Sequence, residues 1–153
     1  MTIDLYRSSH ARLRQQMRDS ALATSAALRA ADRAGVRTVE RRVTEMLTGL
    51  RRRSEAESRI LHPLIGKALP TVRESLDRQH TLMARLLDHV ESVLDAFVAA
   101  PSVESASRLD ATVQHFVAAV LPHMEEEEAL MPLLASSLAA DELAAAAHAL
   151  TAD

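Results

Sequence analysis

The sequence predicts an all-α protein, an up-down-up-down antiparallel four-helix bundle with a short C-terminal helix. Alanine and leucine supply most of the 48% hydrophobic content, and the 153 residues include only two Phe, one Tyr and no Trp. Three Gly and five Pro leave few places where a helix must end. Apolar residues recur with the helical period of about 3.6 residues along four long segments. These features together indicate a single domain over residues 1–153.

Five helical segments are expected, with the ranges 3–34, 37–68, 72–99, 103–134 and, for the short C-terminal helix, 141–150. Gly35 is the first residue that disfavours a helix, and Pro70 follows the end of the second segment. Thr71 and Glu74 match a capping box for the third segment, and Ser102 is a favourable N-cap for the fourth. Short connections imply antiparallel neighbours. An elongated coiled coil is the weaker alternative, because polar residues interrupt the apolar faces in a coordinated way.

Those interruptions are histidines and one carboxylate. His10 lies on the first segment, His80 on the third, and His123 and Glu127 on the fourth. His123 and Glu127 are four residues apart and therefore share one helix face. Phe116, seven residues before His123, places that face on the apolar stripe. An unpaired carboxylate would be costly there, so these residues are expected to meet partners inside the bundle.

The chain also repeats itself. The interval from a histidine to a proline is 53 residues over 10–63 and 52 residues over 80–132. Each half therefore consists of a helix with one histidine, followed by a helix that ends in acidic residues, aliphatic residues and a proline. In the first half, Ser54 and Ser58 occupy the positions that correspond to the histidine and glutamate of the fourth segment.

The string HMEEEEALMP at 123–132 resembles the motif of the hemerythrin-like HHE cation-binding family. That family carries one histidine on helices one and three, and HxxxE followed by proline on helices two and four. Gln79-His80 and Ser9-His10 fit the two single-histidine helices, and the resemblance covers about residues 4–135. It implies a four-helix bundle with a metal centre in its middle.

The resemblance implies a metal site formed by His10, His80, His123 and Glu127. Because serines replace both second-helix ligands, we expect non-haem iron, mononuclear in preference to di-iron. Two histidines and one carboxylate, His80, His123 and Glu127, are a common set for mononuclear iron with open positions. His10 would be a further ligand or a neighbour of the ligands. Ser54 and Ser58 should leave room beside the cofactor, and Glu57 or His62 would have to replace a lost ligand if two ions bind.

The expected function is iron-dependent redox chemistry or gas binding with a small molecule: dioxygen, nitric oxide, peroxide or an organic substrate. If the protein is an enzyme, the resemblance implies an oxidoreductase, an oxygenase or a peroxide-handling activity. Tyr6 lies four residues before His10 on the same face, and it is the candidate catalytic residue because it can donate a hydrogen bond to a bound oxygen species. A core tyrosine is the simpler interpretation of the same position.

Two alternatives stay open at this point. Haem b held non-covalently would use His10, His80 or His123 as an axial ligand, with Ser54 and Ser58 making space for the macrocycle. A degenerate bundle without metal would instead act as an interaction or regulatory module, its polar residues satisfying one another. His89 lies on the opposite face from His80 and is expected at the surface, whereas His115, about 80° from His123 around the helix, is expected on the flank of the inner face.

Composition excludes several other classes. The absence of cysteine excludes disulfides, thiolate metal sites and cysteine nucleophiles. A net charge of −3 with charges of both signs gives no indication of nucleic-acid binding. No apolar run approaches the roughly 18 residues of a membrane span, and the N-terminus does not resemble a signal peptide. We therefore expect a cytoplasmic protein without membrane contact, with a homodimer as one option for its assembly.

Overall fold

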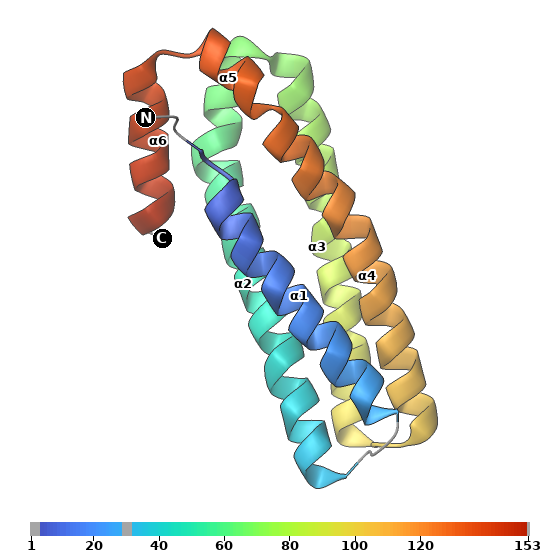
Figure 1. The fold of residues 1–153 in the computed structure, drawn as a ribbon. Coiled ribbons are helices and arrows are strands. Elements are labelled where there is room, and N and C mark those ends of the chain that lie inside the picture. The colour runs from blue at the N-terminus through green and yellow to red at the C-terminus, as the bar shows by residue number, and fades with distance from the viewer. Residues whose placement is uncertain (1–3, 29–31, 153) are drawn as a thin grey trace.

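The computed structural model describes residues 4–28 and 32–152, and these residues form an all-α bundle (Figure 1). The described residues contain six helices: α1 (Arg7–Ala27), α2 (Arg33–Ala68), α3 (Pro70–Ala99), α4 (Val103–Ala129), α5 (Met131–Ser137) and α6 (Ala140–Ala152). Helix α1 packs on α2 and α4, and α3 packs on the same two helices, which closes a four-helix bundle. The predicted fold class is thereby confirmed.

At the starts of the first two helices, an aspartate side chain accepts hydrogen bonds from backbone N–H groups. Asp4 Oδ1 accepts hydrogen bonds from the backbone N–H groups of Tyr6 and Arg7, and α1 starts there. Asp32 Oδ1 accepts from the N–H of Gly35 at 2.7 Å, so Gly35 lies inside the first turn of α2. The predicted break at Gly35 is therefore wrong. The predicted range 3–34 also includes residues 3 and 29–31, which lie outside the described residues.

Helices α3 and α4 begin at a proline and after a capping serine, respectively. Pro70 is the first residue of α3, where its missing N–H costs nothing, and no side chain caps this helix. The predicted capping box of Thr71 and Glu74 is therefore wrong. Ser102 does cap α4, and it forms a reciprocal capping box with Ser105.

The fourth predicted segment is divided in two. Helix α4 ends at Ala129 and α5 begins at Met131, because Pro132 has no N–H to donate to the carbonyl four residues earlier. The single range 103–134 was too long. The short C-terminal helix is present as α6, slightly longer than 141–150, and it packs against α2.

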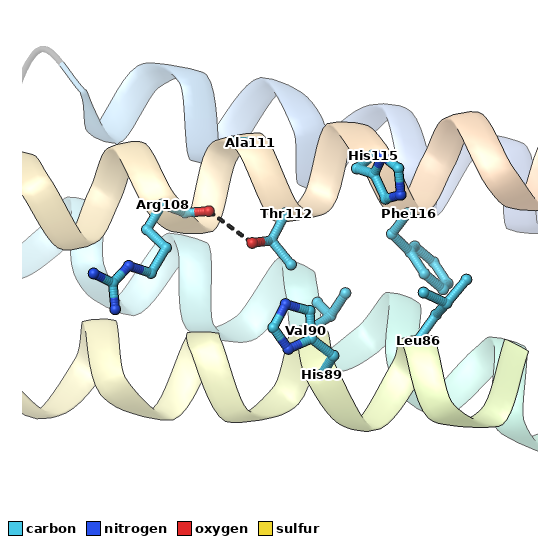
Figure 2. Close-up of a pocket in the computed structure, with 8 residues that line it drawn as sticks. All are labelled: Leu86, His89, Val90, Arg108, Ala111, Thr112, His115 and Phe116. Carbon is cyan, nitrogen blue, oxygen red and sulfur yellow. Dashed lines mark hydrogen bonds between the residues drawn. The ribbon is translucent and has the colours of Figure 1, made fainter. Parts of the chain in front are cut away.

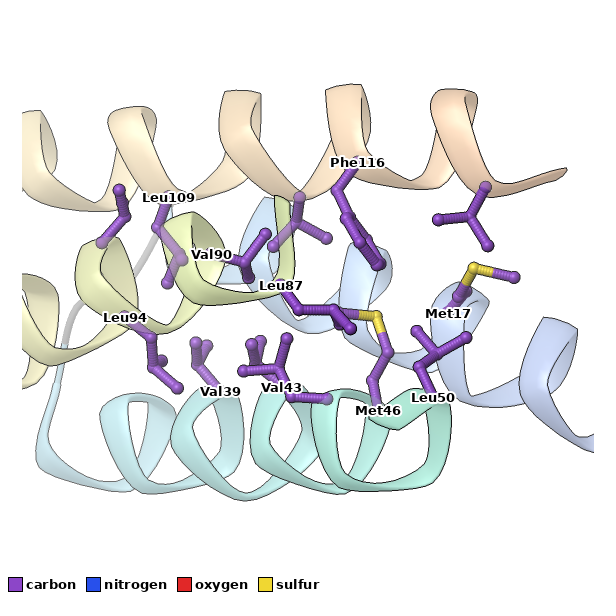
Figure 3. Packing of buried hydrophobic residues seen from close by; sticks show 14 of the residues in the cluster. Met17, Val39, Val43, Met46, Leu50, Leu87, Val90, Leu94, Leu109 and Phe116 are labelled. Atoms are coloured by element: carbon purple, nitrogen blue, oxygen red, sulfur yellow. The ribbon is translucent and has the colours of Figure 1, made fainter. Parts of the chain in front are cut away.

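Two apolar clusters fill the bundle. The main core occupies the half that contains the α1–α2 and α3–α4 connections, and it is built from interdigitating Val, Leu, Met and Phe side chains (Figure 3). A second cluster lies at the end where α5 and α6 cover the bundle, and it includes Leu61, Ile65, Leu76 and Leu134. On α1, α2 and α3 the predicted polar residues fall between these two clusters in sequence, and on α4 His123 and Glu127 flank Met124 at the edge of the main core. No helix in the described part of the chain is long and apolar enough to cross a membrane.

Candidate metal centre

Six polar side chains from all four long helices meet between the two apolar clusters, and we call them the polar layer. Each is at most 7% exposed, and they are His10 of α1, Glu57 and His62 of α2, His80 of α3, and His123 and Glu127 of α4. Carboxylates are seldom buried this deeply unless a partner neutralises them. The two carboxylates of the layer therefore require positive charge beside them, from a protonated imidazole, a neighbouring guanidinium or a metal ion.

Glu127 lies at the centre of the layer and turns its two oxygens to different imidazoles. Its Oε2 is 3.3 Å from His10 Nε2. Its Oε1 is 3.5 Å from His80 Nε2 and 3.4 Å from His123 Nε2. One carboxylate oxygen of Glu127 thus faces His10, and the other faces His80 and His123.

Glu57 repeats this arrangement from α2. Its Oε1 is 3.6 Å from His10 Nε2, and its Oε2 is 3.8 Å from His80 Nε2. Arg53, one turn earlier, donates from Nε to Glu57 Oε1. Both carboxylates of the layer therefore lie between the imidazoles of α1 and α3.

These separations fit ligands of a common ion better than hydrogen bonds. Nitrogen–oxygen hydrogen bonds are about 2.7–3.2 Å long. Two atoms that each lie about 2.1 Å from one ion are roughly 3.0–3.4 Å apart at octahedral or tetrahedral angles. The distances from 3.3 to 3.8 Å are close to the second range.

Unpaired atoms in the layer support the same interpretation. Four buried atoms of the layer have no hydrogen-bond partner: His62 Nε2, His80 Nε2, His123 Nε2 and Glu127 Oε1. Two sets of ligand atoms each lie within 4.8 Å of one another, namely His62 with His80 and Glu127, and His10 with Glu57 and Glu127. The residues present therefore fit metal ions, and Glu127 belongs to both sets.

The outer nitrogens of two imidazoles are held by carboxylates. His62 Nδ1 lies 2.5 Å from Asp77 Oδ1, and His10 Nδ1 lies 3.0 Å from Glu128 Oε1. Arg14 also donates to Glu128 Oε1, at 2.6 Å. A proton shared on Nδ1 leaves the Nε2 lone pair free to face the layer, which is the arrangement found around metal-bound histidines.

The other two imidazoles use neutral partners. His123 Nδ1 lies 2.6 Å from Gln79 Oε1, and His80 Nδ1 lies 3.1 Å from the hydroxyl of Ser54 and 3.0 Å from that of Ser58. All four histidines of the layer are thus fixed from outside. The site is prearranged, with each Nε2 turned inward.

Burial and charge shift the proton affinities in the layer. Burial favours neutral His10, but the carboxylates of Glu127 and Glu57 outweigh it and raise the pKa of His10 to about 9. Burial also acts to raise the pKa of Glu127, yet the imidazoles of His10 and His80 lower it to about 2. For His123 burial prevails and lowers the pKa. Without metal, a protonated His10 and the guanidinium of Arg53 provide the positive charge beside the two carboxylates of the layer.

The structure brings together the four predicted ligands on α1, α3 and α4, but the expected inward position of Ser54 and Ser58 is wrong. Ser58 is exposed and Ser54 half-buried, and both contact the outer nitrogen of His80. Glu57 and His62 occupy the layer instead. A signal for Glu57 was available, since it continues the seven-residue spacing of Val43 and Leu50 on the buried face.

The remaining predicted residues are also placed. Tyr6 is fully buried, with its ring centroid 5.3 Å from that of His10. His89 is exposed, as expected, and His115, which was expected on the flank, is exposed too. Both line a hollow of about 290 Å³ between α3 and α4 (Figure 2). No carboxylate lines this hollow, so it lacks the ligand combination of the polar layer.

Comparison with protein families identifies this architecture. The model of the hemerythrin HHE cation-binding domain matches residues 1–131 and again residues 71–153. The chain belongs to the hemerythrin family. The second, overlapping match begins in α3, as expected for a hemerythrin chain whose two halves repeat. Searches of curated proteins and of solved structures found no match.

Proposed function

We propose that this hemerythrin-family protein holds two non-haem iron ions in the polar layer and uses them to bind or reduce a small molecule such as dioxygen, nitric oxide or peroxide. The observation that carries the proposal is that both Glu57 and Glu127 direct separate oxygens toward His10 and His80. Each of these carboxylates would offer one oxygen to either of two ions held beside these imidazoles. Glu57 and His62 supply the α2 ligands that Ser54 and Ser58 lack. We therefore propose two ions, whereas the sequence alone favoured one.

The six ligands divide unequally between the two positions. We assign His62, His80 and His123 to a first position, together with the oxygens of Glu57 and Glu127 that face them. His10 and the opposite oxygens of the same two carboxylates form the second position. The second position thus has a single imidazole and fewer protein ligands, which leaves room for an exogenous ligand.

Bound iron would supply open coordination positions and electron transfer to a small molecule. The protein would exclude bulk water from the ions and orient their ligands. The two apolar clusters on either side of the layer exclude bulk water. Asp77, Gln79 and Glu128 orient the imidazoles, and His10 gives up its proton when a metal ion takes its place.

The distances favour bare ions over haem. A porphyrin bound to His80 Nε2 would have to lie between this atom and the carboxylates of Glu57 and Glu127, which are 3.8 and 3.5 Å away. The partnerless nitrogen atoms of His62, His80 and His123 argue against a metal-free module, because such a module would pair its polar atoms internally.

Elemental analysis and visible spectroscopy of the purified, iron-supplied protein test the proposal. We expect about two iron atoms per chain and no Soret band. One iron per chain would support the mononuclear site instead, a Soret band would support haem, and an uncoloured protein without metal would support the interaction module.

A pair of histidine variants tests the location of the centre. We expect His123→Ala to lose its iron, because this imidazole faces Glu127 inside the layer. His89→Ala is the control, since His89 lies on the surface of the neighbouring helix. Equal iron retention in the two variants would refute the assignment of the polar layer.

A further inference from the structure

The hydroxyl of Tyr6 is a buried polar atom that the proposed ions leave unexplained. Tyr6 has no exposed surface, and its hydroxyl has no hydrogen-bond partner among the described residues. The orphaned atoms of the polar layer are lone pairs of imidazoles and of Glu127, which a cation satisfies. A phenol hydroxyl is a donor, and it requires an acceptor that the described part of the chain does not provide.

The position of Tyr6 indicates where this acceptor would lie. Its ring contacts the imidazole of His10, with 5.3 Å between the ring centroids. A tyrosine hydroxyl has an ordinary pKa of about 10, so it is a hydrogen-bond donor near neutral pH. Tyr6 therefore presents a hydrogen-bond donor on the side of the layer that carries His10.

The chain holds Tyr6 firmly in this place. Arg53 donates to the carbonyl of Leu5 at 2.8 Å and to Glu57, and its guanidinium carbon lies 5.7 Å from the centre of the Tyr6 ring. Asp4 Oδ1 accepts from the Tyr6 N–H at 3.1 Å. Leu5 is itself buried in the second apolar cluster. The residues before α1 are thus tied to a side chain that also contacts the polar layer.

We propose that Tyr6 donates a hydrogen bond to a small electron-rich ligand, two or three atoms in size, bound to the metal position on the His10 side. The inference rests on the proposed function. Three protein ligands at that position leave coordination sites open, and the buried layer admits only a small molecule. The neighbours of Tyr6 in the second cluster are mainly aliphatic, so its hydroxyl is the donor that would orient the ligand.

Azide binding to the iron-loaded protein tests the hydrogen bond. Tyr6→Phe removes only the hydroxyl, and Ser20→Ala is a matched control that removes another buried hydroxyl from α1, one bonded to backbone carbonyls. We expect equal iron content in wild type and both variants. Tyr6→Phe should bind azide about tenfold more weakly by optical titration, as expected for the loss of one hydrogen bond to an anion. Ser20→Ala should bind azide like wild type.

The ultraviolet spectrum provides a second measurement, because Tyr6 is the one tyrosine in a chain without tryptophan. We expect no phenolate difference band when iron binds. A phenolate band, or loss of iron from Tyr6→Phe, would make Tyr6 a ligand and overturn the inference. Unchanged azide affinity in Tyr6→Phe would also overturn it and would leave the dinuclear centre intact. A wild-type protein that takes up no iron would instead refute the proposed function, and the inference with it.

Discussion

Helices α2 and α4 supply the same two kinds of ligand to the polar layer by different spacings. On α4, His123 precedes Glu127 by four residues, which places the two side chains about 40° apart around the helix. On α2 the order is reversed, and Glu57 precedes His62 by five residues, or about 140°. The metal site thus depends on where the ligand atoms meet and tolerates a change in the order of the residues.

The different spacings have a geometric consequence. His123 Nε2 and Glu127 Oε1 are 3.4 Å apart, and we assign both to one of the two proposed metal positions. The α2 pair diverges: Glu57 lies between His10 and His80, whereas the His62 ring is 4.5 Å from that of His80. Helix α4 therefore concentrates its ligands, and α2 spreads them across the layer.

The largest expected effect is the loss of both ions in Glu127→Gln. Glu127 belongs to both candidate ligand sets, and a neutral amide of the same size would leave Glu57 as the one carboxylate of the layer for two positions. Iron content should fall from about two atoms per chain to near zero. Glu125→Gln is the control, because Glu125 is exposed on the same helix. If Glu127→Gln retained one iron atom, α4 would not hold the bridge that joins the two positions.

A smaller loss is expected from Glu57→Gln. This variant removes a carboxylate from the position that has only His10 as its imidazole, while three histidines still serve the other. We expect about one iron atom per chain, with the helical circular dichroism unchanged. Exposed Glu55 provides the control variant, Glu55→Gln. Full iron content in Glu57→Gln would show that the α2 carboxylate is not a shared ligand. Helices α2 and α4 would then differ in their roles at the centre as well as in their ligand spacing.

The sequence was sufficient to predict the features of α2 and α4 that depend on local periodicity. The four long helices follow from apolar spacing, and α4 was predicted together with both of its ligands because a four-residue spacing fixes a common face. Helix starts were less predictable. The start of α2 depends on the Asp32 side chain reaching Gly35 N–H, and composition alone assigns glycine to a break.

The α2 ligands were less predictable because helix rotation is a tertiary property. Alignment of the two halves of the repeat makes Ser54 and Ser58 the sequence equivalents of His123 and Glu127. Packing turns α2 by about 60° from that expectation, so that Glu57 enters the layer and the serines contact His80 from outside. An internal repeat conserves helix order, but neighbouring side chains determine which face of each helix is buried.

The smallest expected effect concerns the contact between Asp77 and His62. His62 is the α2 imidazole, and it does not follow the HxxxE spacing. Asp77 holds its Nδ1, whereas His123 on α4 is held by the neutral Gln79. Asp77→Asn keeps the shape but removes the charge, and such changes near metal-bound histidines weaken metal affinity about 10- to 100-fold. We expect one of the two iron ions to be removed faster by a chelator. Asp88→Asn on the same helix is matched, because both aspartates also pair with an arginine. Equal release rates in the two variants would mean that His62 needs no charged support and that α2 and α4 hold their imidazoles equally well.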